Sequence, residues 1–369
     1  MRILYGVNGE GMGHATRSEV VISALLAEHD VRVMASGAAF KYLEPRLGHV
    51  GEIFGPSFAM DHGEIRRWAS VTHTMEAARR ELPDSVRRWM AAVHEWQPDV
   101  VVTDFEPLSG IYARSAHTPL VCVDNIHMVA RCRHDHEITA GAHEDYRIAC
   151  AVTRAMVPTA GDYVITTFFN PPLLRGRTVL VPPIVRPAVV VAQPERGEHL
   201  LVYSGGSDEL IDALRGCGVP SRVYGMRDGP EVGTTDGAVE YRPRSVDGFL
   251  EDLVSACGVI TGGGFSLLSE AVYLGKPVLS IPLRGQFEQL MNARYLQREG
   301  FGMCAPAIDA PTLSAFLDGL DGFHHRLGDY VQDGNVEALD TIVERVTAAG
   351  ADTRRERARA RRQARARQA

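Results

Sequence analysis

The sequence alternates twice between short β-rich apolar runs and stretches of helical composition. The first series begins with RILYGV at Arg2 and passes through DVVVTDF at Asp99 to DYVITTF at Asp162. The second begins with HLLVYS at His199 and passes through GVITGGG at Gly258 to a final strand in KPVLSIP. Strands that alternate with helices form parallel sheets covered by helices on both faces. We therefore predict an α/β protein with two doubly wound domains in tandem and a ligand cleft at the carboxyl ends of their strands.

A proline-rich segment from Asn170 to His199 separates the two series and predicts the connection between domains. A chain of 369 residues is long enough for two domains of ordinary size. We expect a first domain over residues 1–185 and a second over 186–350, whose closing helices lie near Thr312–Leu320 and Val336–Ala348. Residues 351–369 form an Arg-rich tail.

Charge is segregated along the chain. The net charge is −7, yet Arg354–Ala369 contains eight Arg and one Glu, so the body of the protein is strongly acidic. An acidic body argues against nucleic acid as the main ligand. The tail is either a solvated extension or a peripheral contact to anionic lipid. A homodimer is also left open.

No apolar run approaches the ~20 residues of a membrane helix, and the chain starts with a strand rather than a secretory signal. These features predict a cytoplasmic protein, and the Arg- and Ala-rich composition suggests a bacterium of high GC content. The six cysteines are scattered without a CxxC pair, which predicts reduced core thiols. The cluster RCRHDHE (Cys132, His134, His136, Glu137) has no second half elsewhere, so we predict no metal site.

Three strand-to-helix turns carry glycines: NGEGMGHATR from Asn8, YSGGSDE from Tyr203 and TGGGFSLLSE from Thr261. Glycine lets a bound group approach the backbone, and the N–H groups at the following helix start bind anions. The second predicted strand ends in Ser36 and Gly37, where a dinucleotide site needs an acidic residue, so a dehydrogenase is disfavoured. No turn has the Lys-Ser/Thr pair of a phosphate loop, which disfavours an ATPase or GTPase.

The block from Gly258 to Gly302, GVITGGGFSLLSEAVYLGKPVLSIPLRGQFEQLMNARYLQREGFG, resembles the donor site of nucleotide-sugar glycosyltransferases of the GT-B fold. The resemblance is to the group that contains the peptidoglycan N-acetylglucosaminyltransferase, the monogalactosyldiacylglycerol synthases and antibiotic glycosyltransferases. It implies two Rossmann-like domains and a UDP-sugar as co-substrate, with no further cofactor. The chain departs from many small-molecule members in having Thr261 where they have a His before the glycines.

The resemblance also implies the donor-binding residues. Glu270 would hold the ribose hydroxyls, since a carboxylate accepts two hydrogen bonds from a vicinal diol, and it could equally be an acidic residue favoured near its helix N-terminus. Glu288 and Gln289, with Gln286, would hold the sugar hydroxyls. Arg242 would reach phosphate or lie in a solvated loop. Two turns would bind the diphosphate. The first would consist of Gly205, Gly206 and Ser207, and the second of Gly262, Gly263 and Gly264 with the nearby hydroxyl of Ser266.

On the acceptor side the candidates for the catalytic base are His14, after the first glycine turn, and Asp104 and Glu106, at the end of a predicted strand. Imidazole can take a proton near neutral pH, and an acidic group can orient it. Asp104 could instead cap the following helix, and the sequence leaves open which of the three is the base. Residues predicted to line the acceptor site are Gly11, Met12, Gly13, Asp124, Asn125 and His127.

The expected reaction is an inverting, metal-independent transfer of a sugar to a hydroxyl of a small-molecule acceptor, such as a natural product or a nucleoside. Two alternatives remain. A hydrolysing nucleotide-sugar epimerase shares the fold and the donor half, and a non-catalytic nucleotide-sugar-binding protein would use the site only to bind.

Overall fold

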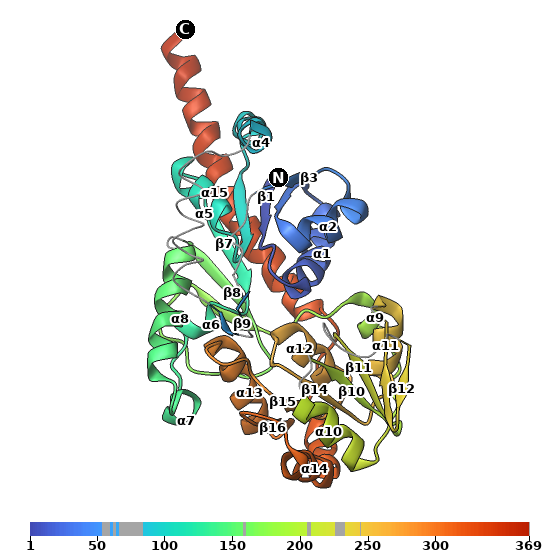
Figure 1. Cartoon of the computed structure of the whole chain (residues 1–369). Helices are drawn as coiled ribbons and strands as arrows, with labels where there is room; N and C mark the ends of the chain where they lie inside the picture. The colour runs from blue at the N-terminus through green and yellow to red at the C-terminus, as the bar shows by residue number, and fades with distance from the viewer. Residues whose placement is uncertain are drawn as a thin grey trace. The chain divides into compact units, whose positions relative to one another are not determined.

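The computed structural model describes residues 1–53, 60–61, 64–65, 84–157, 160–204, 208–225, 233–243 and 245–368. They form two compact units. The first unit comprises Met1–Arg133, Tyr146–Ile184 and Asn335–Ala369, and the second comprises His134–Asp145 and Val185–Gly334. Each unit is built on its own sheet of seven strands (Figure 1).

The first sheet has the strand order β3-β2-β1-β6-β7-β8-β9, and all its pairs are parallel. Counted along the chain this is the order 3-2-1-4-5-6 of a doubly wound domain with one added strand. Its strands are β1 (Arg2–Val7), β2 (Asp30–Ala35), β3 (Val50–Glu52), β6 (Val100–Asp104), β7 (Leu120–Asp124), β8 (Asp162–Thr166) and β9 (Thr178–Val181).

Helices cover both faces of this sheet. Alternate residues of β1, such as Ile3 and Tyr5, share a core with α1 and α15, whereas Gly6 lies against Ser109 of α5 on the other face. This two-sided burial explains the continuous apolar strands. The helices that begin in this unit are α1 (Met12–Leu26), α2 (Gly37–Leu47), α4 (Asp84–Trp96), α5 (Pro107–Ser115), α6 (Met128–Arg131) and α15 (Val336–Gln368), and most of α8 (His143–Met156) belongs to it.

The second sheet repeats the plan in the order β12-β13-β11-β10-β14-β15-β16, with only β12 antiparallel. Its strands are β10 (Leu200–Tyr203), β11 (Ser221–Tyr224), β12 (Thr235–Asp236), β13 (Val239–Tyr241), β14 (Gly258–Thr261), β15 (Val278–Ser280) and β16 (Gly302–Cys304). The helices of this unit are α7 (His136–Thr139), α9 (Pro187–Val190), α10 (Asp208–Cys217), α11 (Val246–Val254), α12 (Phe265–Tyr273), α13 (Phe287–Glu299) and α14 (Ala310–Gly328).

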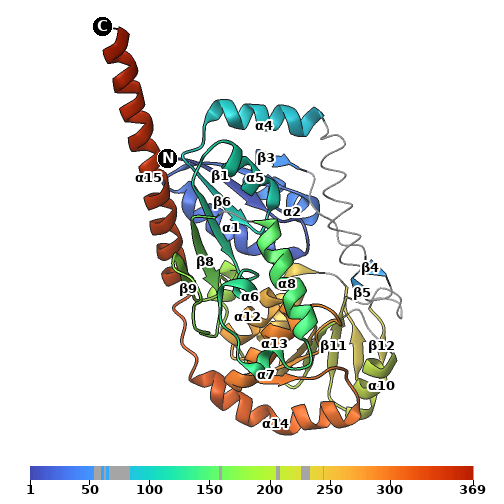
Figure 2. The ribbon, with the colours of Figure 1, turned by 90° about the vertical axis from the view of Figure 1, so that its left-hand side faces the viewer.

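The closing helix departs from the expected division of the chain. We expected residues 336–350 in the second domain, but α15 packs Ala338, Ile342 and Val346 into the core of the first sheet. Figures 1 and 2 both show α15 running beside the strands of that sheet. The backbone of the predicted Arg-rich tail continues this helix to Gln368. An apolar helical stripe predicts burial without identifying the sheet that buries it, which is why the sequence misplaced the helix.

Two further segments correct the sequence-based division. His134–Asp145 belongs to the second unit, where Arg294 of α13 donates to the Ile138 carbonyl at 2.8 Å. The proline-rich segment is not all connection, because β9 pairs in parallel with β8 before the chain leaves the first unit at Ile184.

After β3, the short strands β4 (Met60–Asp61) and β5 (Glu64–Ile65) pair antiparallel, and α4 follows them in the chain. Among the described residues no helix is both long and apolar enough to cross a bilayer. All six cysteines are free thiols, and four of them are buried.

Candidate active site in the first unit and glycine turn in the second

Both sheets reverse their winding direction next to the first strand, between β1 and β6 in one and between β10 and β14 in the other. Crevices outside the carboxyl ends of strands at such a switch point are where open α/β sheets bind ligands. His14 follows β1 and Asp104 ends β6, so the two residues stand on either side of the first switch point. The triple-glycine turn follows β14 at the second.

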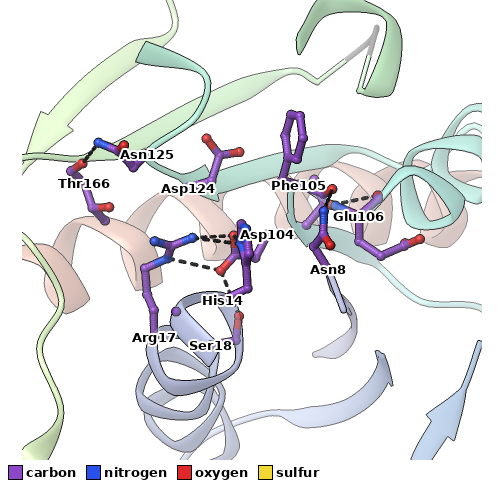
Figure 3. A network of polar contacts seen from close by, with 12 residues as sticks. Asn8, His14, Arg17, Ser18, Asp104, Phe105, Glu106, Asp124, Asn125 and Thr166 are labelled. Carbon is purple, nitrogen blue, oxygen red and sulfur yellow. Dashed lines mark hydrogen bonds and ion pairs between the residues drawn. The ribbon is translucent and has the colours of Figure 1, made fainter. Parts of the chain in front are cut away.

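Asp104 is the centre of a buried polar network (Figure 3). Its Oδ1 lies 2.7 Å from His14 Nδ1 and accepts from Arg17 Nη2 at 2.5 Å. Its Oδ2 accepts from Arg17 Nε at 3.1 Å and from Ser18 Oγ at 3.0 Å. His14, Arg17 and Ser18 share one face of α1 because residues three and four apart are neighbours on a helix. One helix therefore supplies every side chain that holds the Asp104 carboxylate.

The protonation of this network follows from its contacts. Burial by itself would raise the pKa of Asp104, but the Arg17 charge and the hydrogen bonds from His14 and Arg17 together lower it below its usual range. The ionised carboxylate can only accept hydrogen bonds, so His14 Nδ1 carries the hydrogen that faces it. Nε2 is then the ring nitrogen on the side away from Asp104, and the His14 side chain is 16% exposed.

Asn8 forms hydrogen bonds that connect the two loops next to His14 and Asp104. Its Nδ2 donates to the Phe105 carbonyl at 3.1 Å, its Oδ1 accepts from Glu10 N at 2.9 Å, and its own N–H donates to the Asp104 carbonyl at 3.2 Å. Phe105 has φ of 54°, a left-handed conformation that is uncommon for a bulky residue and clusters at functional sites. Asn8 thus fixes the β1–α1 turn against the strained end of β6.

Glu106 does not belong to this network. It is fully buried, and its carboxylate caps α5 by accepting from Leu108 N at 2.8 Å and Ser109 N at 2.6 Å. Burial is the main cause that raises its pKa to about 7. The capping role that the sequence allowed for Asp104 therefore belongs to Glu106, and both of its oxygens are engaged by the backbone.

The six residues predicted to line an acceptor site fall into two groups. Gly11 and Met12 are exposed and Gly13 is half-buried at the start of α1, where no side chain caps the helix. Asp124, Asn125 and His127 are buried and order the turn after β7. Asp124 accepts from the backbone N of His127 at 2.8 Å and pairs with its Nδ1 at 2.7 Å, and Asn125 donates to the Thr166 carbonyl at 3.0 Å.

One set of side chains could be considered for a metal ion. The potential ligand atoms of Cys122, Asp124 and His127 lie within 4.8 Å of one another. The hydrogen bond from His127 Nδ1 occupies Asp124, however, and burial holds the pKa of the Cys122 thiol well above its usual value. Of the RCRHDHE cluster, His134 pairs with the Tyr295 hydroxyl at 2.8 Å and Glu137 with Arg298 at 3.6 Å.

In the second unit the turn Gly262–Gly264 leads from β14 into α12. Gly263 has φ of 93°, and a Cβ there would lie 2.9 Å from the Gln289 carbonyl oxygen and 3.0 Å from Ser280 Oγ. Gly264 is exposed at the helix N-cap, has ordinary φ, and a Cβ there would meet no atom within 4 Å. The turn is thus packed closely on one side and open on the other, with no side chain capping the helix start. Ser266 lies half-buried in the first turn of α12.

Glu270 is buried in α12 beyond its first turn, so a preference for the helix N-terminus does not explain it. Its two oxygens accept from Arg186 Nε at 2.6 Å and Nη2 at 2.7 Å. This is a bidentate pair between side chains that are only 16% and 8% exposed. Arg186 directly precedes α9, and the carboxylate predicted for the ribose is already held by a guanidinium in the chain itself.

The remaining donor candidates lie at the start of α13 or in other loops. Gln289 accepts from Leu283 N at 3.1 Å and adjoins the glycine turn, because its Oε1 would lie 3.4 Å from a Cβ on Gly262. Gln286 is the N-cap of α13, and Glu288 is half-buried in its first turn. The structure therefore brings the glycine turn and α13 together.

Arg242 has a different environment from the one expected. Its guanidinium donates to Asp252 Oδ2 at 3.0 Å and to Glu240 Oε1 at 2.8 Å. Asp252 is buried and also accepts from the Tyr224 hydroxyl at 2.5 Å. Internal ion pairs thus explain Arg242 without a phosphate. Gly205, Gly206 and Ser207 lie outside the described residues.

Sequence reasoning missed four participants in these sites: Asn8, Arg17, Ser18 and Arg186. Arg17 and Ser18 had a usable signal, since they lie three and four residues after His14 on a predicted helix. Arg186 had none, because its partner Glu270 is 84 residues away in the sequence.

These two sheets and their switch-point turns define a glycosyltransferase of the GT-B fold. The chain belongs to glycosyl transferase family 1, whose family model matches residues 1–321. It is 24% identical over 335 residues to an uncharacterized glycosyltransferase of Methanosarcina acetivorans, with 82% of this chain and 85% of that protein covered.

Solved structures agree on the fold. The crystal structure of the glycosyltransferase VinC in complex with dTDP is similar with a TM-score of 0.65 and 13% identity, over 95% of this chain and 100% of that chain. The crystal structure of LpCGTa in complex with UDP is similar with a TM-score of 0.61 and 14% identity, over 94% and 99% of the two chains.

Proposed function

We propose that the protein is an inverting glycosyltransferase that moves a sugar from a nucleoside diphosphate donor to a hydroxyl of a small-molecule acceptor. The observation that carries this proposal is the buried pair of His14 and Asp104 at 2.7 Å, which leaves one imidazole nitrogen free to accept a proton. A paired, oriented imidazole is the usual general base near neutral pH.

In the proposed reaction His14 Nε2 takes the proton of the acceptor hydroxyl as its oxygen attacks the anomeric carbon. The bond from that carbon to the diphosphate oxygen breaks, and the nucleoside diphosphate leaves with the electron pair. Asp104 stabilises the imidazolium that forms, and Arg17 and Ser18 keep the carboxylate in place. A single displacement of this kind inverts the anomeric centre.

Negative charge grows on the leaving diphosphate, and the start of α12, whose N-cap Gly264 has no side-chain capping bond, is suited to meet it. Helix N-termini bind phosphate through free N–H groups and the helix dipole. Preorganised donors of this kind need no reorganisation during the reaction. We propose that this turn takes the stabilising role without a metal ion.

A UDP-sugar is the first donor to test, and a dTDP-sugar the second. LpCGTa was crystallised with UDP and VinC with dTDP, and both share this fold. Glu270 would hold the ribose hydroxyls, with Arg186 orienting its carboxylate. The exposed start of α1 at Gly11 and Met12 would face the acceptor.

The test is the effect of His14→Ala on turnover, measured by mass spectrometry of products from a panel of nucleotide sugars and cell-extract acceptors. Loss of a general base lowers kcat by about 10²–10⁴-fold, and we expect the donor KM to stay within about twofold. The matched control is His94→Ala, which removes an exposed histidine of α4. Native kcat in His14→Ala would refute the assigned base.

Incubation with donor alone separates the alternatives. An isomerised sugar with free nucleotide would identify a hydrolysing epimerase. Donor binding by calorimetry without turnover across the acceptor panel would identify a binding protein. Peripheral membrane contact through Arg354–Ala369, a homodimer and a cytoplasmic location stay predictions.

A further inference from the structure

A polar cavity lies in the first unit, and none of the residues that hold Asp104 lines it. It is formed by α6, the end of α8, the start of β8 and the loop before β9, and its volume is about 150 Å³. A cavity of about this volume admits a ligand the size of benzene. Its lining residues are His127, Ala130, Arg131, Arg154, Val157, Ala160, Tyr163 and Arg175.

Three of these residues are arginines, and none of the lining residues is acidic. Arg131 is held in place, with its guanidinium carbon 3.8 Å from the centre of the Tyr163 ring and Nη2 donating to Thr178 Oγ1 at 2.8 Å. Burial is the main cause that lowers the pKa of Arg131, and the nearby charge of Arg175 lowers it further. The positive charges of Arg131 and Arg175 therefore lie close together, and their repulsion costs free energy.

Within the described part of the chain, no carboxylate forms an ion pair with Arg154 or Arg175, although other arginines of this unit have such partners. Arg177 pairs with Asp162 at 3.6 Å, and Arg345 with the same carboxylate at 3.4 Å. The cavity therefore gathers positive charge, and two of its guanidiniums are exposed and can meet an anion.

His127 supplies a buried hydrogen-bonding atom. The residue is 3% exposed, its Nδ1 is engaged by Asp124, and its Nε2 has no hydrogen-bond partner among the residues described. A buried polar atom without a partner costs free energy unless a ligand or water satisfies it. His127 lines the same cavity as the three arginines.

We infer that this cavity is a binding site for a phosphate group carried by a ligand other than the sugar donor. Guanidinium groups match the geometry of phosphate oxygens and bind them in pairs, and a phosphate monoester also has a hydroxyl that donates to His127 Nε2. A divalent cation does not fit, because three guanidiniums would repel it. The inference does not depend on the proposed glycosyl transfer.

The test is calorimetric titration of the full chain with inorganic phosphate and with pyrophosphate at fixed ionic strength. The variant Arg154→Gln/Arg175→Gln removes two exposed charges, neither of which pairs with a carboxylate in the described part of the chain. Each hydrogen bond to a charged group contributes roughly tenfold to affinity, so we expect the dissociation constant to rise about a hundredfold. Arg147→Gln, an exposed arginine on the same helix α8, is the matched control and should bind as the unmodified chain does.

The source of the phosphate is distinguished by vesicles of phosphatidic acid mixed with phosphatidylcholine. Co-sedimentation that is lost in the double variant and kept in Arg147→Gln supports the site with a lipid as its ligand. Phosphate binding without sedimentation supports it with a soluble ligand. Equal loss in the double variant and the control, or no binding of any of these probes, overturns the inference.

Discussion

The two switch points of this molecule are built in different ways. In the first unit His14, Arg17 and Ser18 all hold one buried carboxylate, Asp104, and every one of these contacts comes from a single helix. In the second unit the turn Gly262–Gly264 offers backbone at an uncapped helix start, and its acidic residue Glu270 is held by one distant partner.

We expect this difference to govern how each switch point binds a ligand. A carboxylate with several partners keeps its position whether or not a ligand is present, which suits a group that must orient a base. The turn Gly262–Gly264 has an open side, and the Glu270 carboxylate is held by Arg186 alone among the described side chains. Both can therefore accept new hydrogen-bond partners with little rearrangement. The comparison predicts that substitutions in the first network affect turnover as well as stability, whereas those around the turn affect stability or donor binding.

The largest effect is expected from Asp104→Asn. The amide cannot keep the imidazole in the orientation and charge state of a base, so we expect kcat to fall by about 10²–10⁴-fold. Loss of the charge also leaves Arg17 buried without its counterion, which costs about 3–5 kcal/mol. Steady-state kinetics and thermal unfolding measure the two effects. Ser18→Ala removes only one of the contacts and should cost less than about tenfold in kcat, and equal losses in both variants would contradict the dominant role of the charge.

Arg186→Met tests the single clamp on Glu270. Removing one partner of a buried ion pair costs about 3–5 kcal/mol, because the other charge is left uncompensated. We expect a loss toward the lower end of that range in denaturant unfolding, since Arg186 keeps some contact with solvent. In the double variant Arg186→Met/Glu270→Gln most of this loss should be recovered. Additive losses would mean that the two side chains act independently.

The two sides of the glycine turn can be tested separately. Gly263→Ala places a Cβ against the Gln289 carbonyl at positive φ, so it should destabilise the protein by about 1–3 kcal/mol. Gly264→Ala has ordinary φ and an open site, so the melting temperature should not change.

Only donor binding should suffer in Gly264→Ala, because the methyl group stands where a phosphate would approach the backbone. We expect the donor KM to rise about tenfold. A native KM in this variant would separate the turn from the donor site and weaken the proposed function.

The sequence predicted most of the architecture, because strand and helix periodicity is a local property. It also named His14 and Asp104 as candidates, and the structure pairs these two side chains at 2.7 Å. It could not separate Asp104 from Glu106, because two acidic residues after one strand are equivalent until the side of the sheet is known. Asp104 faces α1, whereas Glu106 turns back to cap α5. The pairing of Arg186 with Glu270 and the packing of α15 on the first sheet depend on long-range contacts, which no local sequence pattern contains.

Glu106 gives the smallest predicted effect on turnover and completes the comparison, because it is the buried acid next to the network and has no hydrogen bond to His14 among the described residues. Its pKa is raised from 4.5 to about 7. The folded protein therefore binds the proton more tightly than the unfolded chain, so this contribution to stability is complete below about pH 4.5 and is lost as the pH rises through about 7.

The loss is expected to be a few kcal/mol, because a difference of one pKa unit between the folded and unfolded states corresponds to about 1.4 kcal/mol. Glu106→Gln has no proton to lose there, so the melting temperature of the unmodified chain should fall relative to that of the variant between pH 5 and 8. A constant difference between the melting temperatures of the unmodified chain and of Glu106→Gln from pH 5 to 8 would show that the Glu106 carboxyl is already ionised at pH 5. In that case the cap of α5 would be a charged one, like Asp104, and burial would not separate the two acids.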